Sequence, residues 1–177
     1  MTQAPAKPSP LARPLRVDTI PGLGLETVVE ASEQERAALA KEFGLASIEE
    51  LKGTYKVNRR GRTVLVDGKV TASVTQTCVV TLEPFPAKVD EPVALKFTDD
   101  PVKLNPADEA GEHEAPVDAP DPIVDGRVDL GAVTAEFLAL ALDPYPRKPG
   151  VDFTWDEGAP EPSPFAALEA LKKPPQT

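Results

Sequence analysis

Residues 63–97, TVLVDGKVTASVTQTCVVTLEPFPAKVDEPVALKF, decide the fold that we expect for this chain. From Lys69 onward apolar and polar residues alternate, which is typical of a β-strand with one face in a core and the other in solvent. Gln76 interrupts the apolar row, which consists of Val70, Ala72, Val74, Cys78, Val80 and Leu82. The alternation returns in a second row, Val89, Val93, Leu95 and Phe97. We therefore predict a long antiparallel pair of strands.

Two turn signals divide this stretch. Asp67-Gly68, flanked by alternating residues, favours a two-residue hairpin turn after a strand over residues 63–66. The alternative is a bulge within one continuous strand, because the apolar parity is the same on both sides of the dipeptide. We favour the hairpin. Pro84 and Pro86 mark the turn into the second long strand.

The N-terminal third carries clear helix and strand signals. Residues 1–12 are rich in proline and small residues, which predicts a disordered leader. Two short strands follow, broken at Pro21-Gly22. Ser32 and Glu35 form a capping-box pattern, and Gly44 is a suitable C-terminal stop, so we predict a helix over about 33–43.

One more helical turn and one strand are expected before residue 63. Ser47 is interpreted as the cap of a helical turn over residues 48–51. Residues 55–58 have strand character, and residues 59–62, Arg-Arg-Gly-Arg, form a turn.

The C-terminal half combines an acidic segment with an apolar helix. Residues 99–126 hold nine carboxylates and one lysine, which predicts a mobile loop. Asp129 is a plausible N-cap for a helix over residues 130–142, which Pro144 ends. Its apolar stripe consists of Leu130, Val133, Phe137, Leu140 and Ala141, with Leu138 and Leu142 beside it. A proline-rich tail, 156–177, contains a possible short helix from Ser163 to Leu171.

These elements predict one α+β domain over residues 13–155. We expect a mainly antiparallel, twisted sheet or partial barrel, with the helix 130–142 packed on it and the shorter helix near the N-terminus. The 177 residues suffice for one sizeable core.

Charge and cysteine content limit the partners and the compartment. The net charge is −10, so the chain as a whole repels phosphate backbones and favours a basic protein partner. Cys78 is the only cysteine, which excludes an internal disulfide and favours a reducing compartment. Because no apolar run has the length of a signal peptide or a membrane span, we expect a soluble, cytoplasmic protein without membrane contact.

Few residues indicate catalysis. Cys78 is interpreted as a small buried hydrophobic residue rather than a nucleophile, and His113 lies in the acidic segment. One cysteine and one histidine make a zinc site improbable. Glu136 is either an acid with a raised pKa or, as we prefer, a partner in a structural hydrogen bond or salt bridge. We therefore expect no catalytic residue, no metal and no cofactor.

A basic group surrounds the turn at residues 59–62. It consists of Lys56, Arg59, Arg60, Arg62 and Lys69. Arginines at a turn can bind phosphate oxygens bidentately, but a solvated turn that discourages edge pairing explains them slightly better, because Tyr55 is the one aromatic residue nearby. Arg147, in Asp143-Pro144-Tyr145-Pro146-Arg147, is placed to reach Glu136 or a partner, and Tyr145 to pack.

Two motifs resemble the YceD family, whose members are described as large ribosomal RNA subunit accumulation proteins. The first is residues 76–84, QTCVVTLEP, and the second combines Asp129-Leu130-Gly131, Ala135-Glu136 and residues 140–147, LALDPYPR. The resemblance covers about residues 13–155 and is closest to the alphaproteobacterial branch. Its motif residues here are Cys78, Leu82, Pro84, Asp129, Leu130, Glu136, Asp143, Pro144, Tyr145, Pro146 and Arg147.

The resemblance implies a role in synthesis, processing or stability of large-subunit (23S) ribosomal RNA. It carries over no catalytic residues. Many members have Cys-x-x-Cys at the end of the strand, whereas Thr81 stands at the second position here, so a metal role of that pair is not available to this chain.

Three functions remain in competition. The first is a non-enzymatic ribosome-biogenesis factor that contacts precursor RNA through Arg59, Arg60 and Arg62, or a basic ribosomal protein through its acidic surface. The second is a Mg²⁺-dependent nuclease that uses carboxylates of the acidic segment. The third is a protein-interaction module without RNA contact. We prefer the first.

Overall fold

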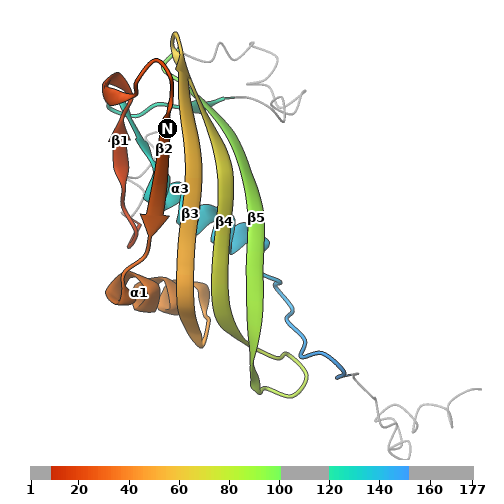
Figure 1. Cartoon of the computed structure of the whole chain (residues 1–177). Helices are drawn as coiled ribbons and strands as arrows, with labels where there is room; N and C mark the ends of the chain where they lie inside the picture. The colour runs from red at the N-terminus through yellow and green to blue at the C-terminus, as the bar shows by residue number, and fades with distance from the viewer. Residues whose placement is uncertain (1–8, 101–119, 152–177) are drawn as a thin grey trace, which may run out of the picture.

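Three long strands dominate the structure of this chain, a computed structural model that describes residues 9–100 and 120–151. They are β3 (Ser47–Arg60), β4 (Thr63–Thr77) and β5 (Pro84–Thr98). Together with β2 (Leu25–Glu30) and β6 (Asp121–Pro122) they form a sheet in the order β2-β3-β4-β5-β6, antiparallel except for the β5–β6 pair. The sheet is curved and open (Figure 1), so the prediction of an α+β domain with a mainly antiparallel sheet is confirmed.

A second, two-stranded sheet and two α-helices complete the described part. β1 (Pro14–Arg16) pairs antiparallel with β7 (Arg127–Asp129), and η1 (Val17–Thr19) follows β1. α1 (Glu33–Phe43) lies at one end of the sheet, and α3 (Leu130–Ala141) crosses behind the long strands (Figure 1). Both helices were predicted close to these bounds.

The caps of both helices follow from the sequence. The Ser32 side chain accepts from the backbone N–H of Glu35, whose carboxylate accepts in turn from the N–H of Ser32, and Gly44 ends α1 at a φ of 68°. Arg13 adds a bidentate pair to Glu35, with its Nη1 2.8 Å from Oε1 and its Nη2 3.0 Å from Oε2. The segment before β1 is thereby tied to the first turn of α1.

The hairpin predicted at Asp67-Gly68 is wrong, because β4 continues through both residues without a register shift. Gly68 lies opposite Tyr55 on β3. A Cβ at this position would lie 2.9 Å from Cδ1 of Tyr55 and 2.1 Å from the carbonyl oxygen of Thr54. The glycine is therefore needed for close packing inside the sheet rather than for a turn.

The helical turn predicted after Ser47 is also wrong, since β3 begins at that residue. The register against β4 shifts between Ile48 and Glu50. Because of this irregularity Ile48 and Leu51, three residues apart, are both buried. The bulge therefore places two buried residues three positions apart, a spacing that in the sequence resembles the apolar face of a helix.

The ends of the predicted strand pair differ from expectation. β4 ends at Thr77, and Leu82 is exposed rather than buried. Pro84 and Pro86 belong to β5 itself. The carbonyl of Thr98 faces away from β4 and accepts from Ile123. The backbone N–H and C=O groups of the even-numbered residues of β5 point to this same edge. The prolines at 84, 86 and 92 have no N–H there, so a further strand would lack backbone donors with which to pair.

Parts of two segments that were predicted to be disordered or mobile pack against the rest of the structure. Leu11, in the segment predicted as a disordered leader, has no exposed surface and belongs to the core. At the end of the acidic segment, β6 pairs with Phe97 and Thr98. Residues 101–119 with His113, and the helix predicted from Ser163 to Leu171, lie outside the described residues.

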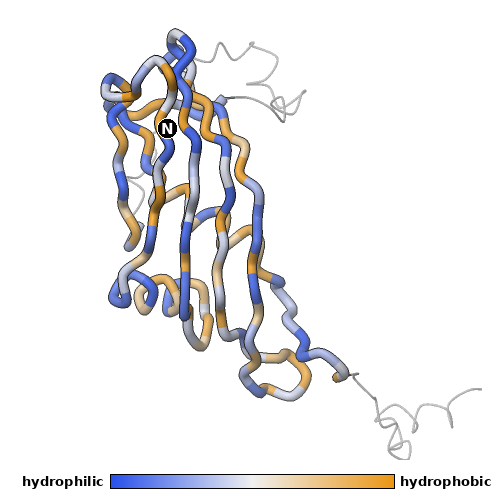
Figure 2. The backbone as a smooth tube through the Cα atoms, viewed as in Figure 1, coloured by the Kyte–Doolittle hydropathy of each residue, from blue (hydrophilic) through white to orange (hydrophobic). Residues whose placement is uncertain are grey.

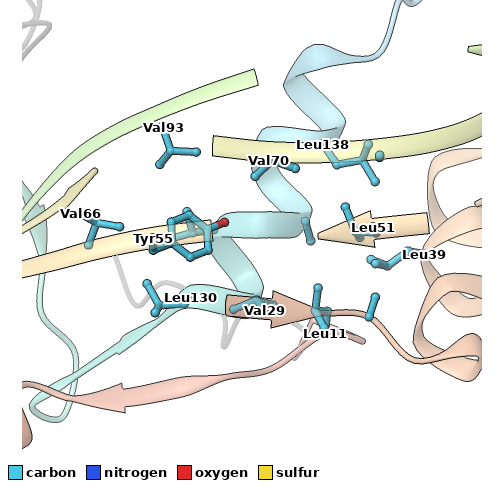
Figure 3. Close-up of a cluster of buried hydrophobic side chains, with 14 of the residues drawn as sticks. Leu11, Val29, Leu39, Leu51, Tyr55, Val66, Val70, Val93, Leu130 and Leu138 are labelled. Atoms are coloured by element: carbon cyan, nitrogen blue, oxygen red, sulfur yellow. The ribbon is translucent and has the colours of Figure 1, made fainter. Parts of the chain in front are cut away.

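The core lies between α3 and the concave face of the sheet. Hydropathy alternates along the strands (Figure 2), with the buried rows facing α3. Tyr55 points from β3 toward the helix (Figure 3), and its hydroxyl lies 2.7 Å from Oγ1 of Thr134, which also donates to the carbonyl of Leu130 at 2.7 Å. On the opposite side of α3 Leu140 is 71% exposed, which contradicts its predicted burial.

We predict that Gly68→Ala lowers the free energy of unfolding by about 1–3 kcal/mol, the range for overpacking a well-packed core. The added methyl group has to displace the Thr54 carbonyl and the Tyr55 ring. Gly22→Ala is the matched control, because nothing lies within 4 Å of the place that a Cβ would occupy there. Urea unfolding of both variants measures the difference, and equal stability would contradict this role of Gly68.

We also predict that Glu35→Gln costs about 1 kcal/mol at neutral pH, because glutamine loses the ion pair with Arg13 although its amide oxygen can still accept from the Ser32 N–H. Hydrogen bonds from Arg13 and then from the Ser32 N–H lower the pKa of Glu35 to about 2. The unfolded value is roughly 4.3, so the carboxylate stabilises the fold above that pH and this contribution disappears as the pH falls toward 2. Urea unfolding at several pH values should show the wild type and the variant converging below pH 4, and Glu33→Gln, the same change in the same helical turn, is the control for the loss of one carboxylate.

Candidate functional site

In the arginine turn between β3 and β4, Arg62 pairs with carboxylates and Arg59 with backbone carbonyls. Arg62 contacts Asp99 through Nε at 2.8 Å and Asp100 through Nη1 at 2.8 Å. The hydrogen bond between Arg62 and Asp99 raises the pKa of the guanidinium and lowers the pKa of the carboxyl. Arg59 donates to the carbonyls of Gly61 and Val17, at 3.1 and 3.3 Å. Two of the three arginines are thus already engaged within the chain.

The other predicted binding residues do not gather at this turn. Lys56 is exposed on the outer face of the sheet, where Lys69 contacts Asp90 at 3.3 Å. Arg147 is exposed beyond α3, next to the β4–β5 turn at the other end of the sheet. The 15 residues of β4 separate the two ends by about 50 Å. A single phosphate site cannot include both Arg147 and the arginine turn.

The two sequence motifs meet in space, through residues that are more than 60 positions apart in the chain. The Gln76 side chain donates to the carbonyl of Asp143 at 3.3 Å, and the N–H of Val79 donates to the carbonyl of Pro146 at 2.9 Å. Lys148 completes the contact, with its Nζ 2.9 Å from Oε2 of Glu83. We call this region, residues 76–84 together with 143–148, the motif junction. It fastens the chain after α3 to the β4–β5 turn.

Cys78 lies inside the motif junction and has no exposed surface. Its Sγ accepts from the N–H of Lys148 at 3.4 Å. This bond, together with donors from Thr81 and Val80, lowers the pKa of the thiol to about 6. The burial matches the interpretation of Cys78 as a core residue, and its donors give the sulfur a structural role in joining the two motifs.

Asp129, Leu130 and Gly131 serve the fold. One oxygen of Asp129 accepts from the N–H groups of Arg13, Gly131 and Ala132, at 2.7, 2.9 and 3.1 Å. A Cβ on Gly131 would lie 2.6 Å from the carbonyl oxygen of Leu11, so only glycine allows the N-terminal segment to cross here. Leu130 is buried in the core.

Other motif residues face solvent. Leu82, at a φ of 57°, is 76% exposed, and Tyr145 is 72% exposed, so the packing expected of Tyr145 is not observed. Pro84 and Pro144 are exposed too. Glu136 is exposed on α3, and in the described part of the chain it has no hydrogen bond or ion pair with Arg147. Exposed residues of a shared motif are candidates for binding rather than for folding.

Two open clefts lie beside these residues, and the sequence did not indicate either. One, of about 410 Å³, lies at the motif junction against the end of α1, with Phe43, Leu45 and Leu142 in its wall. The other, of about 420 Å³, lies between β5 and α3, and we call it the β5–α3 groove. Leu95, Phe97 and Val133 line it, with Asp121 and Glu136 as carboxylates. Finding it required the crossing position of the helix.

The described residues were compared with two further kinds of site, metal-ligand clusters and membrane-spanning helices. Within residues 9–100 and 120–151, no three side chains of His, Cys, Asp or Glu come together as possible metal ligands. Neither described helix has the length and apolar character needed to span a bilayer.

Comparison with known proteins gives one finding. The model of the family described as "Large ribosomal RNA subunit accumulation protein YceD" matches residues 66–172, which is more than half of the chain. No curated protein and no solved structure matches significantly. The match contains both motifs and the whole motif junction, whereas the N-terminal elements that support them precede it.

We predict that the thiol of Cys78 titrates near pH 6. Its absorbance as a thiolate at 240 nm, recorded against pH with Cys78→Ser as the blank, measures the pKa directly. The Lys148 N–H cannot be removed by changing the Lys148 side chain, so Lys148→Ala should leave the midpoint nearly unchanged, whereas Thr81→Val should raise it. A wild-type midpoint near the ordinary value of about 8.5 would show that these donors do not stabilise the thiolate.

Proposed function

Since the chain belongs to the YceD family, we propose that it is a ribosome-biogenesis factor for the large subunit. The match over residues 66–172 carries this proposal. The specific role that we infer is support of the synthesis, processing or stability of 23S ribosomal RNA. We further infer that the protein acts without catalysis in the cytoplasm.

Two observations favour action through a ribosomal protein over direct contact with RNA. The net charge of −10 opposes association with a phosphate backbone. In addition, Arg62 already has two carboxylate partners and Arg59 two carbonyl partners, so phosphate contact at the turn has to displace existing bonds. A basic ribosomal protein encounters neither obstacle.

The arrangement of side chains also supports a non-enzymatic role. Cys78 is enclosed and fastened to the chain after α3, and within the described residues no three side chains of His, Cys, Asp or Glu come together. A nuclease that uses the acidic segment is the alternative. Incubation of the purified protein with precursor RNA and Mg²⁺ tests it, and site-specific cleavage would support the alternative.

We predict that replacing Arg59, Arg60 and Arg62 together by alanine leaves function intact. The triple variant should restore 23S ribosomal RNA in a strain that lacks the gene as well as the wild type does. Lys41, Lys88 and Lys96, changed together to alanine, form a control with the same change in net charge. Northern blots of 23S RNA relative to 16S RNA provide the measurement.

Direct RNA binding makes the opposite prediction. In that case the wild type binds precursor RNA at low salt with a steep salt dependence, and the arginine triple variant, but not the lysine control, loses tenfold or more in affinity. Pull-down with and without ribonuclease adds a separate criterion, because partners held through a ribosomal protein survive the nuclease.

A further inference from the structure

The β5–α3 groove combines an apolar floor with a negatively charged rim. Leu95 and Phe97 on the inner face of β5 are only half buried, although they pack against the core. Val133 of α3 closes the opposite wall. The floor therefore offers a hydrophobic surface that no described segment of the chain covers completely.

The rim carries carboxylates that the fold leaves available. Glu136 on α3 and Asp121 on β6 are both exposed, and neither has a hydrogen bond or ion pair with another described residue through its side chain. Asp129 also lines the groove, but its oxygen is engaged as the N-cap of α3. Arg127 is the cation among the lining residues. The available charge at the rim is therefore predominantly negative.

Glu136 further connects the groove to the family. It lies within residues 66–172, which the family model matches, and its exposed position gives it no role in packing. Asp129, by contrast, is explained by helix capping. A motif carboxylate without a fold role, placed at the edge of an apolar groove, is what a binding site for a charged partner requires.

We propose that the β5–α3 groove binds a lysine- or arginine-rich segment of a ribosomal protein, with an apolar side chain of that segment against Leu95 and Phe97. Glu136 and Asp121 then pair with the flanking cations. This inference rests on the proposed function and names the site and the chemistry of its partner. The groove volume of about 420 Å³ suits one or two side chains rather than a whole domain.

RNA fits this groove less well than a basic peptide. Its phosphates would face the carboxylates of Glu136 and Asp121 at the rim. The opposite charges of the rim and of a basic peptide instead speed their association and disfavour acidic competitors. The apolar side chain of the peptide, packed in the groove, supplies affinity.

Photo-crosslinking locates the partner. A photoreactive phenylalanine analogue is placed at Glu136 and, as control, at Asp67, which is exposed on the opposite face of the sheet. The probe is the protein fraction that lithium chloride releases from large ribosomal subunits, with mass spectrometry of the cross-linked peptides. We expect position 136, and not 67, to cross-link to one basic segment that contains a large apolar residue. Equal cross-linking at both positions, or preferential cross-linking to added precursor RNA, would overturn the proposal.

Charge reversal then tests the rim. The double variant Glu136→Lys with Asp121→Lys is compared with Glu26→Lys and Asp67→Lys, which changes the net charge equally on the outer face. A synthetic peptide of the cross-linked segment should lose at least tenfold in affinity for the first variant and little for the second. Equal losses would contradict a specific rim. Since all four side chains are exposed, we expect both variants to fold, and Glu136→Gln extends the test if a thermal melt shows otherwise.

The level of 23S RNA in cells distinguishes a failure of the proposed function from a failure of the groove proposal. If loss of the gene leaves 23S RNA unchanged, the proposed function is wrong, whatever the cross-linking shows. If loss of the gene lowers 23S RNA and the Glu136/Asp121 double variant restores it fully, the groove is dispensable and this inference alone is wrong. We expect the double variant to fail and the control variant to restore the RNA.

Discussion

The position in which α3 packs across the long strands is the constraint on which the rest of the structure depends. The Tyr55 hydroxyl reaches Thr134 in the middle of the helix, and the ring fits because Gly53 and Gly68 carry no side chains. A Cβ on Gly53 would lie 2.6 Å from the Tyr55 hydroxyl oxygen. A large aromatic residue and two glycines therefore set the distance of α3 from the sheet and its position on the sheet. The buried hydroxyl pair keeps the helix from shifting along the sheet, because an unpaired hydroxyl in this core would cost free energy.

That position has consequences at both ends of the helix. At the N-terminus the segment around Leu11 crosses Gly131 so closely that the first residues of the domain become part of the core. At the C-terminus the chain runs alongside the β4–β5 turn and forms the motif junction. Along its side, α3 leaves Leu95 and Phe97 incompletely covered, which opens the β5–α3 groove. One crossing helix thus determines how the segment around Leu11 packs, where the two motifs meet and where the β5–α3 groove lies.

The family motifs separate into two physical classes in this structure. Asp129, Leu130 and Cys78 cap, pack and join elements, and their burial or bonding explains why the fold needs them. Glu136 and Tyr145 are exposed and satisfy no such need. The first class maintains a scaffold that holds the second in place.

Local chemistry in the sequence determined both described helices and their caps, because Ser32 with Glu35, Gly44 and Asp129 act on backbone groups within a few residues. It also determined the buried faces of β4 and β5, since the period of two needs no knowledge of the neighbours. Only the tertiary structure decided that Gly68 is a packing residue and that Ile48 and Leu51 share a face through a bulge. The compensation of Arg62 by Asp99 and Asp100, the meeting of the motifs and the groove beside Glu136 were likewise decided there. Each of these depends on residues that are distant in the chain, and the pattern along one segment contains no information about which distant segment will face it.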